Sequence, residues 1–446
     1  MDYAALMKTM QETGVGQAAV EGAWWSPAVQ PVMMNSADHT QLTQIGRALF
    51  DFTDAVSAEL RENPKGAFAK RLHQKVPQHI AQTLNFAPVL MFRPDLQLVP
   101  TAEGLQFVLT EIEIAPFSEG CAHAMQVAYG VSADIVPAFA NMLNGRDLLF
   151  VGTHEWNQYQ FDQLAFCKAL ATHGARGRVL YDRTVAQMEA EIACGDRWQE
   201  LVADGEQASM TGHIARHQLE PFVQDAWPDH VEDAVIFRFG YVEHFTAAQH
   251  QLFKRWQAQG ATFLNPFSFH LDSKVLLEGV HTPAIRQRLA VDTLTILERC
   301  VPETWLLTAE RVDQLVTEKD DWLIKFAGFD QTNTAWGGRS VRFGRDFSAE
   351  TWRTLLQNAL ALNWPTVAQR LAVSQQVSLE YYQPDGSIAT QDNGFTRLRT
   401  FFLRNGITDP NPIHCGSHIT INKGMNVSEA SPDAIQTPVQ FSFEFN

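Results

Sequence analysis

The sequence predicts a mixed α/β and α+β protein built from several units, and three observations carry this expectation. The chain has 446 residues, whereas a domain usually takes about 100–200 residues. Its first part has the apolar spacing of helices, its middle alternates strand and helix patterns, and its last part is rich in strand patterns. With 45% hydrophobic and 19% charged residues, the chain carries enough apolar material to fold compactly.

Residues 1–87 form a predicted helical region, which is followed by a hairpin. The apolar residues between positions 42 and 60 recur every three or four residues, which is the period of an amphipathic helix. The stretches around Met91 and from Gly104 onward then have the composition of two strands, with a turn at residues 101–104. We therefore expect residues 88–145 to contain an antiparallel hairpin that carries acidic side chains.

Residues 146–267 alternate apolar strand patterns with helical patterns. Predicted strands begin at Asp147, Arg178, Ala234 and Thr262. This alternation indicates a parallel sheet covered by helices. Sheets of this kind bind small ligands at their strand ends, but a G-x-G-x-x-G motif is absent, so nicotinamide binding is not supported. Turn-forming residues near Arg146 and Pro266 mark the expected boundaries of this unit.

Residues 268–446 are expected to form an α+β unit on an antiparallel sheet. A helical segment is predicted from Leu276 to Glu298, and a second helix from Ser348 to Leu362. The predicted strands of this unit begin at Trp322 and at Gly337, and cover Val377–Tyr382 and Gln440–Phe445.

Composition narrows the class of protein. Lys plus Arg number 34 and Asp plus Glu number 50, which gives a formal net charge of −16 and repels phosphate backbones and anionic membranes. The five cysteines contain no C-x-x-C pair, so neither a disulfide framework nor a zinc site is indicated. Neither a secretory signal nor an apolar span of about 18 residues is found. We expect a soluble, cytoplasmic protein with no nucleic-acid or membrane partner.

Three carboxylates on the predicted hairpin form the first candidate site. Glu111 and Glu113 are two residues apart on an apolar strand, so their side chains leave the same face, and Asp95 precedes them. Adjacent carboxylates repel each other unless a cation lies between them, and Mg²⁺ prefers such hard oxygen ligands. The alternative is an ordinary strand whose charged face lies in solvent.

Two lysines and a glycine-containing run form the second candidate site. Lys274 precedes a predicted helix, and Lys325 lies between apolar residues of a predicted strand, where a desolvated ammonium needs an anion. The adjacent glycines Gly337 and Gly338, followed by Arg339, could present N–H groups and charge to phosphate. The alternatives are a lysine that reaches solvent at the strand edge and a simple hairpin turn.

Taken in chain order, these features resemble the ATP-grasp fold in its circularly permuted form, as in the synthetase domain of glutathionylspermidine synthase and its relatives. The resemblance runs from about Pro88 to the C-terminus and is one of pattern. It implies a parallel pre-ATP-grasp-like substrate domain at 146–267 and nucleotide-binding lobes at 268–446. The metal-binding strands precede the nucleotide-binding lysines, as they do in the permuted family.

The resemblance also implies roles for individual residues. Arg93 and Arg339 would contact the transferred phosphate, and Arg397 or Arg399 would act nearby. Asp95, Glu111 and Glu113 would bind Mg²⁺, although Glu113 stands where the family has asparagine. The residues that would bind ATP are Lys274, Lys325, Gly337, Gly338 and Gln369, the last on the strand beside adenine.

The implied function is that of an ATP-dependent ligase that joins a small carboxylate to an amine of the amino acid, peptide or polyamine class through an acyl phosphate. On that basis Lys325→Ala or Asp95→Asn should abolish turnover with little loss of folding. A catalytically degenerate nucleotide-binding module and a phosphotransferase acting on a hydroxyl are the alternatives. The sequence does not predict an oligomeric state.

Two histidine motifs outside this set are alternative candidate sites. His414, Cys415 and His418 could suggest a metal site, but they lack the glutamate of H-E-x-x-H and run into a strand pattern. Cys121 and His123 could suggest a redox or acyl-transfer pair, but groups so close in sequence are more often parts of a packed loop.

Overall fold

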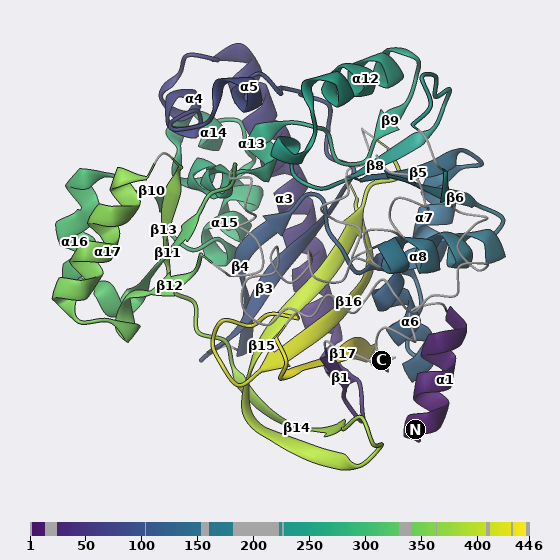
Figure 1. The fold of residues 1–446 in the computed structure, drawn as a ribbon. Coiled ribbons are helices and arrows are strands. Elements are labelled where there is room, and N and C mark those ends of the chain that lie inside the picture. Colours follow the sequence, from purple (N-terminus) through teal and green to yellow (C-terminus); the bar gives the residue numbers. More distant parts are fainter. Residues whose placement is uncertain are drawn as a thin grey trace, which may run out of the picture.

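The structure is a computed structural model of the chain. It describes residues 2–13, 25–102, 104–152, 160–181, 223–224, 227–329, 340–362, 364–406, 411–429 and 431–442. The described residues form an eight-stranded central sheet, a five-stranded sheet and a four-stranded sheet, with helices packed around them (Figure 1).

The central sheet is assembled from three distant parts of the chain. Its strand order is β1-β17-β16-β15-β3-β4, with β14 paired to β15 and β2 paired to β17. Its strands are β1 (Trp25–Pro27), β2 (Val32–Asn35), β3 (Met91–Thr101), β4 (Gly104–Glu113), β14 (Gln376–Tyr382), β15 (Ile388–Leu403), β16 (Ile413–Asn422) and β17 (Ala434–Ser442).

The predicted β3–β4 hairpin is confirmed, with Thr101 opposite Gly104 at its turn. The N-terminal region contains β1 and β2 in addition to its predicted helices, and both strands pair with β17 in parallel. The sequence pattern missed β1 and β2 because they have only three and four residues, too few to show a period. The last predicted strand, β17, ends at Ser442, so residues 443–445 of that prediction lie outside the described residues.

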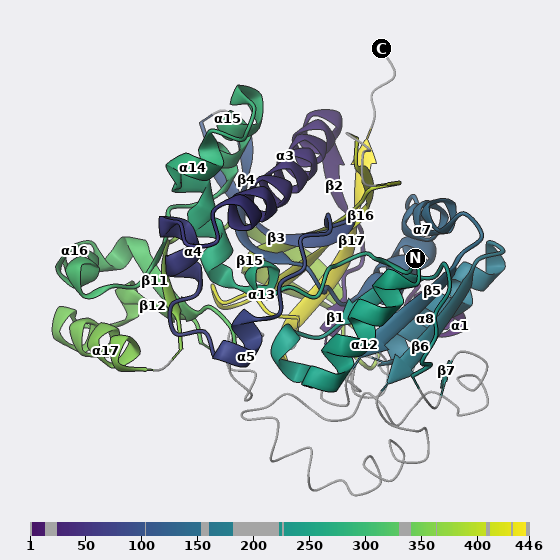
Figure 2. The same cartoon turned by 90° about the horizontal axis from the view of Figure 1, so that it is seen from above.

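Helix α3 (Ser36–Glu62) covers one face of the central sheet (Figure 2). A capping box starts it, because the side chain of Asn35 accepts from the amide of Asp38 and the side chain of Asp38 accepts from the amide of Asn35. A Cβ at Gly46 would overlap the ring of Phe402, so glycine lets the helix approach β15 closely. The other helices of this N-terminal region are α1 (Tyr3–Thr13), α4 (Ala67–Leu72) and α5 (Gln78–Ala81).

The parallel sheet predicted for residues 146–267 is confirmed. Its order is β7-β6-β5-β8-β9, and each adjacent pair runs parallel. Its elements are β5 (Asp147–Gly152), α8 (Gln160–Thr172), β6 (Arg176–Tyr181), β7 (Val223–Gln224), β8 (Val235–Phe239), η3 (Val242–His244), α12 (Ala247–Ala258) and β9 (Thr262–Phe263). Helices α6 (Glu119–Tyr129) and α7 (Ile135–Leu143) connect it to the hairpin.

A small lobe lies at the left of Figure 1. Its antiparallel sheet has the order β10-β13-β11-β12, and Trp305, Trp322 and Trp352 fill the core beneath its helices. Its elements are β10 (Thr304–Leu306), η5 (Ala309–Arg311), α16 (Val312–Thr317), η6 (Lys319–Asp321), β11 (Trp322–Phe326), β12 (Arg342–Phe343), η7 (Gly344–Asp346), α17 (Ala349–Ala361) and β13 (Thr366–Arg370).

The helical segment predicted from Leu276 to Glu298 is divided among several short helices. The chain forms α13 (Phe269–Asp272), the 3₁₀ helix η4 (Lys274–His281), α14 (Pro283–Arg286) and α15 (Val291–Cys300). Proline at the first position of α14 has no N–H to continue a preceding helix, and so it begins a new one. Among the described residues, no helix is long and apolar enough to cross a bilayer.

Candidate functional site

Four strands of the central sheet place ionisable side chains in one row. Glu111 of β4 lies opposite Asp95 of β3, Asp95 lies opposite Arg399 of β15, and Arg399 lies opposite His418 of β16. Side chains at facing positions of adjacent strands lie on the same face of the sheet. Strand register therefore brings residues from opposite halves of the sequence into one site.

Asp95 is the centre of a buried cluster of arginines. Its carboxylate lies 3.2 Å from Nε of Arg93, 3.5 Å from Nε of Arg399 and 3.7 Å from the guanidinium of Arg397. Burial alone would raise the pKa of Asp95, but the arginines outweigh it and hold that pKa below its usual value. Asp95 is therefore ionised at neutral pH, and it balances cations that could not be buried alone.

The two glutamates of β4 have opposite electrostatic environments. Burial would raise the pKa of Glu111, but the cations of Lys274 and Lys325 lower it below the usual value. For Glu113, burial and the Glu111 carboxylate raise the pKa to about 8, against the effect of Arg93 on the opposite strand. Glu111 is thus a permanent anion, whereas Glu113 is largely protonated at neutral pH in the absence of an added cation.

Lys274 is held at the first turn of η4. Its ammonium forms an ion pair with Glu111, and its backbone N–H donates to the carbonyl of Ala327 at 3.1 Å. Asp272, two residues before Lys274, forms a bidentate ion pair with Arg238 of β8, at 2.8 and 3.0 Å. Both side chains of that pair are almost fully buried. The parallel sheet therefore fixes the turn that presents Lys274 to the hairpin.

Lys325 lies on β11 of the small lobe, and its side chain contacts the hairpin. Its ammonium donates a 2.6 Å hydrogen bond to the carbonyl of Thr110, next to Glu111. Burial lowers the pKa of Lys325 to about 8, and the nearby Lys274 cation acts in the same direction while Glu111 opposes it. Lys325 is itself 6% exposed, and Trp322, Leu323 and Ile324 before it are buried, so it does not reach solvent at an edge.

One pocket joins these groups. It lies between the small lobe and the central sheet and is lined by both charged and apolar side chains. The charged residues are Glu111, Lys274, Lys325, Arg370 and Arg397, and the apolar residues include Leu323, Val341, Phe343, Val373, Phe395 and Met425. Gln369 also lines it, but its side-chain amide donates to Thr304. A second, smaller pocket is also lined by Glu111 and Lys274, together with Glu113 and Tyr241.

The structure describes some of the remaining predicted residues and not others. Arg93 is buried beside Asp95 and also donates to the carbonyl of Phe117. Gly337, Gly338 and Arg339 lie outside the described residues. The sequence could not choose between Arg397 and Arg399, and the structure places both beside Asp95; only Arg397 lines the pocket.

Several ionisable residues near the site were not predicted. Glu429 lies 3.6 Å from Arg399, and Glu119 is buried near Arg93. Asp162 of α8 accepts hydrogen bonds from the amides of Ser118 and Cys121 at the start of α6. These residues belong to separate segments of the chain, so local sequence patterns do not connect them. The one signal in the sequence is that Asp162 is an acidic residue in a largely apolar predicted helix.

The alternative histidine sites do not form. His414 hydrogen-bonds Ser417 at 2.8 Å, whereas His418 faces the row of Arg399. Cys121 is buried, and burial raises the pKa of its thiol well above the usual value, so it is not an activated nucleophile. Over the described ranges, no three histidine, cysteine, aspartate or glutamate side chains are grouped as a preformed metal cage.

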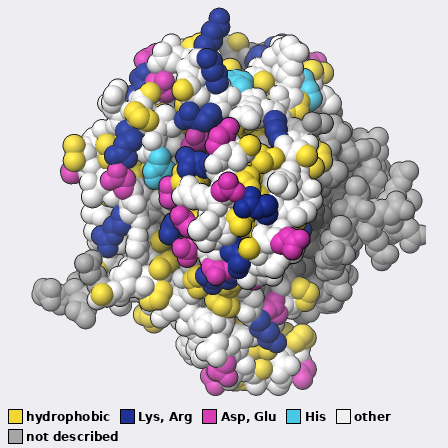
Figure 3. Space-filling view, turned by 90° about the vertical axis from the view of Figure 1, so that its left-hand side faces the viewer, with side chains coloured by type: hydrophobic (Ala, Val, Ile, Leu, Met, Phe, Trp, Pro, Cys, Tyr) yellow, Lys and Arg dark blue, Asp and Glu magenta, His cyan; other side chains and the backbone are white. Residues whose placement is uncertain are grey.

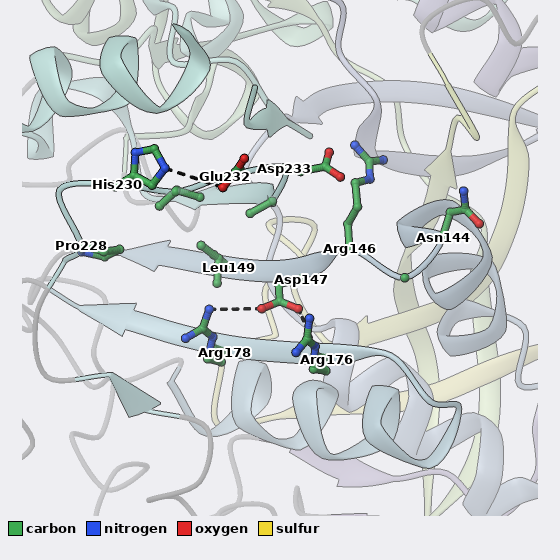
Figure 4. Close-up of a pocket in the computed structure, with 13 residues that line it drawn as sticks. Asn144, Arg146, Asp147, Leu149, Arg176, Arg178, Pro228, His230, Glu232 and Asp233 are labelled. Atoms are coloured by element: carbon green, nitrogen blue, oxygen red, sulfur yellow. Dashed lines mark hydrogen bonds and ion pairs between the residues drawn. The ribbon is translucent and has the colours of Figure 1, made fainter. Parts of the chain in front are cut away.

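A further cavity of about 480 Å³ lies at the start of strands β5, β6 and β8 (Figure 4). Arg176 and Arg178 of β6 line it. Both side chains point toward the carboxylate of Asp147 on the adjacent strand β5, at 2.7 and 3.2 Å. Because parallel sheets bind ligands at the opposite, carboxyl ends of their strands, and because these arginines already have a counter-charge, we do not assign the function here.

Over its described residues, the face that includes the small lobe has no patch of one charge. Lys and Arg side chains alternate with Asp and Glu side chains across it (Figure 3). This mixed surface is unlike the basic stripe that a nucleic-acid-binding face requires.

The fold defines the class of the molecule as a mixed α/β protein with several sheets. No family model matches the sequence, and no curated protein matches it. A solved glutathione synthetase like-effector from Globodera pallida, in its apo form, matches with a TM-score of 0.51 at 10% identity, covering 99% of this chain and 98% of that chain. A candidate gamma-glutamylcysteine synthetase from Methylobacillus flagellatus matches with a TM-score of 0.39 at 9% identity, covering 85% and 84%. The first likeness shows a shared fold over nearly the whole chain, and the second is too low to carry an argument.

Proposed function

We propose that the chain is an ATP-dependent ligase of the ATP-grasp type that joins a carboxylate to an amine through an acyl phosphate. One observation carries this proposal. Lys274, Lys325 and Arg397 come from three different elements and meet the carboxylates of Asp95 and Glu111 beside one pocket that apolar side chains also line. A magnesium nucleotide needs three features: cations that bind its phosphates, carboxylates that bind the metal, and apolar side chains that contact its base.

The residues present fit Mg²⁺. The donors offered by Glu111, Glu113 and Asp95 are carboxylate oxygens, which suit a hard cation. Mg²⁺ usually takes only one or two carboxylates together with substrate phosphates, so the lack of a preformed cage among the described residues agrees with it. When bound, Mg²⁺ would neutralise phosphate charge and orient the terminal phosphate.

The basic residues would bind and orient the triphosphate. Arg397 has a buried Nε without a hydrogen-bond partner among the described residues, and the residue lines the same pocket as Lys274 and Lys325. Arg93 would offset the charge that develops during phosphoryl transfer. Gly337, Gly338 and Arg339 would close over the phosphates, and Gln369 would contribute through the backbone of β13, since its amide is engaged with Thr304.

The substrates would enter from the side of the second pocket. Glu113 and Tyr241 line that pocket together with Lys274, and Tyr241 follows the carboxyl end of β8, where open α/β sheets bind ligands. A substrate carboxylate bound here would attack the terminal phosphate of ATP to give an acyl phosphate and ADP. An amine would then attack the acyl carbon and release inorganic phosphate, which forms the amide bond.

ADP release measured against a panel of amino acids, small peptides and polyamines tests the proposal. We expect release that requires Mg²⁺, one carboxylate and one amine, with a coupled amide product seen by mass spectrometry. ADP release with a phosphorylated hydroxyl product would instead identify a phosphotransferase. If calorimetry detects binding of Mg²⁺–ATP but no ADP is released, the chain is a nucleotide-binding module. If no binding is detected, all three nucleotide-dependent functions are excluded.

A further inference from the structure

Gln97 is a buried polar residue in the same pocket that the sequence did not single out. It lies on β3, two residues beyond Asp95, opposite Val108 of β4. Its side chain lines the pocket that contains Lys274 and Lys325, and the residue is 5% exposed. A polar side chain in such a position needs hydrogen-bond partners.

The side-chain oxygen of Gln97 has no hydrogen-bond partner among the described residues. The other polar side chains near it are engaged: Thr110 donates to the carbonyl of Asp95, Ser374 accepts from the amide of Thr396, and Gln369 donates to Thr304. Gln97 therefore offers a buried acceptor to whatever occupies the pocket.

The chemistry of a nucleotide limits what this acceptor can bind. The oxygens of a magnesium-bound triphosphate accept hydrogen bonds, and they match the free donor on Arg397 but not the oxygen of Gln97. The donors of ATP are the two ribose hydroxyls and the exocyclic amine of adenine. Gln97 is two residues along the strand from Asp95, a rise of about 7 Å, and it lines the pocket that contains Lys274 and Lys325. The ribose is the donor-bearing part of ATP that lies next to the phosphates.

We propose that Gln97 accepts a hydrogen bond from a ribose hydroxyl of the bound nucleotide and makes the pocket selective for ribonucleotides. This inference rests on the proposed function, because it requires that the phosphates lie at Lys274 and Lys325. Sites built to hydrogen-bond a hydroxyl reject the analogue that lacks it, since a buried polar group is then left unpaired.

Calorimetric titration of the full chain with ATP and with 2′,3′-dideoxy-ATP, both with Mg²⁺, tests the inference. We expect the wild type to bind ATP at least tenfold more tightly than the dideoxy analogue. Gln97→Leu should lose that preference by weakening ATP alone. Gln97→Glu keeps an acceptor at this position and should keep the preference. Gln106→Leu, on the same hairpin but outside the pocket, should bind both nucleotides as the wild type does.

Three outcomes would overturn the inference, and they are distinguishable from failure of the proposed function. Equal affinity of the wild type for both nucleotides, or equal weakening of both by Gln97→Leu, would remove the ribose contact while leaving nucleotide binding intact. Loss of the preference in Gln97→Glu, with ATP weakened down to the affinity of the dideoxy analogue, would show that the amide nitrogen of Gln97 and not its oxygen makes the ribose contact. If the wild type binds neither nucleotide, the proposed function fails with it. Gln97→Met replaces Gln97→Leu if thermal unfolding shows that the leucine variant does not fold.

Discussion

The carboxylate of Glu111 on β4 forms an ion pair with the ammonium of Lys274 at the start of η4, and both side chains are largely buried. The proposed metal ligand and the proposed phosphate-binding lysine thus neutralise each other. Mg²⁺ alone must displace Lys274 to reach Glu111, and a metal-free nucleotide must displace Glu111 to reach Lys274. We therefore expect Mg²⁺ and ATP to bind more tightly together than either does alone.

Glu111→Gln tests this competition. We expect the variant to bind Mg²⁺ about tenfold more weakly, because a charged ligand is lost, and to bind ATP more tightly in the presence of EDTA, because Lys274 is released. Titration calorimetry measures both affinities. Glu298→Gln, which removes a more exposed partner of Arg286, should change neither. A parallel loss of both affinities in Glu111→Gln would contradict the competition.

Lys325→Met should abolish nucleotide binding and preserve the fold. Burial lowers the pKa of Lys325 to about 8, so at neutral pH the folded chain holds a charged ammonium in an unfavourable environment. The ammonium loses its proton at a lower pH in the folded state than in the unfolded state. Its unfavourable effect on the free energy of folding therefore lessens as the pH rises from about 8 toward the ordinary pKa of lysine.

Urea denaturation at two pH values measures this effect. The wild type should gain stability relative to Lys325→Met as the pH is raised through 8, and Lys254→Met, at an exposed position of α12, should show no such trend. A wild type that instead loses stability relative to Lys325→Met over this range would mean that a fully paired lysine occupies β11.

Asp95→Asn should destabilise the fold as well as abolish turnover. The sequence alone predicts little loss of folding, but the structure places Asp95 between Arg93, Arg397 and Arg399. Removing one partner of a buried charge cluster costs about 3–5 kcal/mol. The free energy of unfolding in urea measures this cost. Asp313→Asn, which breaks an exposed pair with Arg353, should cost less than about 1 kcal/mol. Equal costs for the two variants would exclude a structural role for Asp95.

The affinity for Mg²⁺ should depend on pH through Glu113. Burial and the neighbouring Glu111 raise the pKa of Glu113 to about 8, and a protonated carboxyl must lose its proton to bind a metal. Affinity should therefore rise with pH and level off above about 8, with a slope of about tenfold per unit below it. Glu113→Asn should flatten this profile.

Glu243→Gln supplies the matched control for that experiment. Burial, with the nearby Asp272 carboxylate, raises the pKa of Glu243 to about 8 as well, but Glu243 is not a proposed metal ligand. Fluorescence titration with Mg²⁺ across the pH range compares the three proteins. A profile that flattens in Glu243→Gln and persists in Glu113→Asn would move the metal away from β4.

Local patterns predicted the elements whose partners are near in sequence. The alternation that begins at Asp147 indicates the parallel sheet, and the turn at residues 101–104 indicates the β3–β4 hairpin. The long strands β15 and β16 were largely missed. They pair with each other, and β15 also pairs with β3, about 300 residues earlier in the chain. Their many polar residues make them resemble solvent-exposed segments, although several of these residues are buried.

The site was predicted by residue type but not by geometry. Lys325 stood out because an ammonium between apolar residues needs a compensating anion, and the structure places it against Thr110 and Glu111. Which arginines contact Asp95 depends on strand register, and a one-residue slip would turn Arg399 to the other face. Nothing in the sequence marked Gln97 as a candidate site residue, because the pocket that it lines is formed by residues from several distant segments.

The order of strands in the central sheet bears on how the protein is made. Thr437 of β17 donates to the carbonyl of Gln30, 407 residues earlier, and β15 joins β3 late in the chain. Domains usually fold as units, N-terminal first, as the ribosome synthesises them, and here the parallel sheet can form while the carboxylate hairpin still lacks its neighbours. The exposed edge of β3 would have to wait for β15, a situation that favours aggregation. We expect nascent chains to depend most on chaperones until strands β14 to β17 have been synthesised and released.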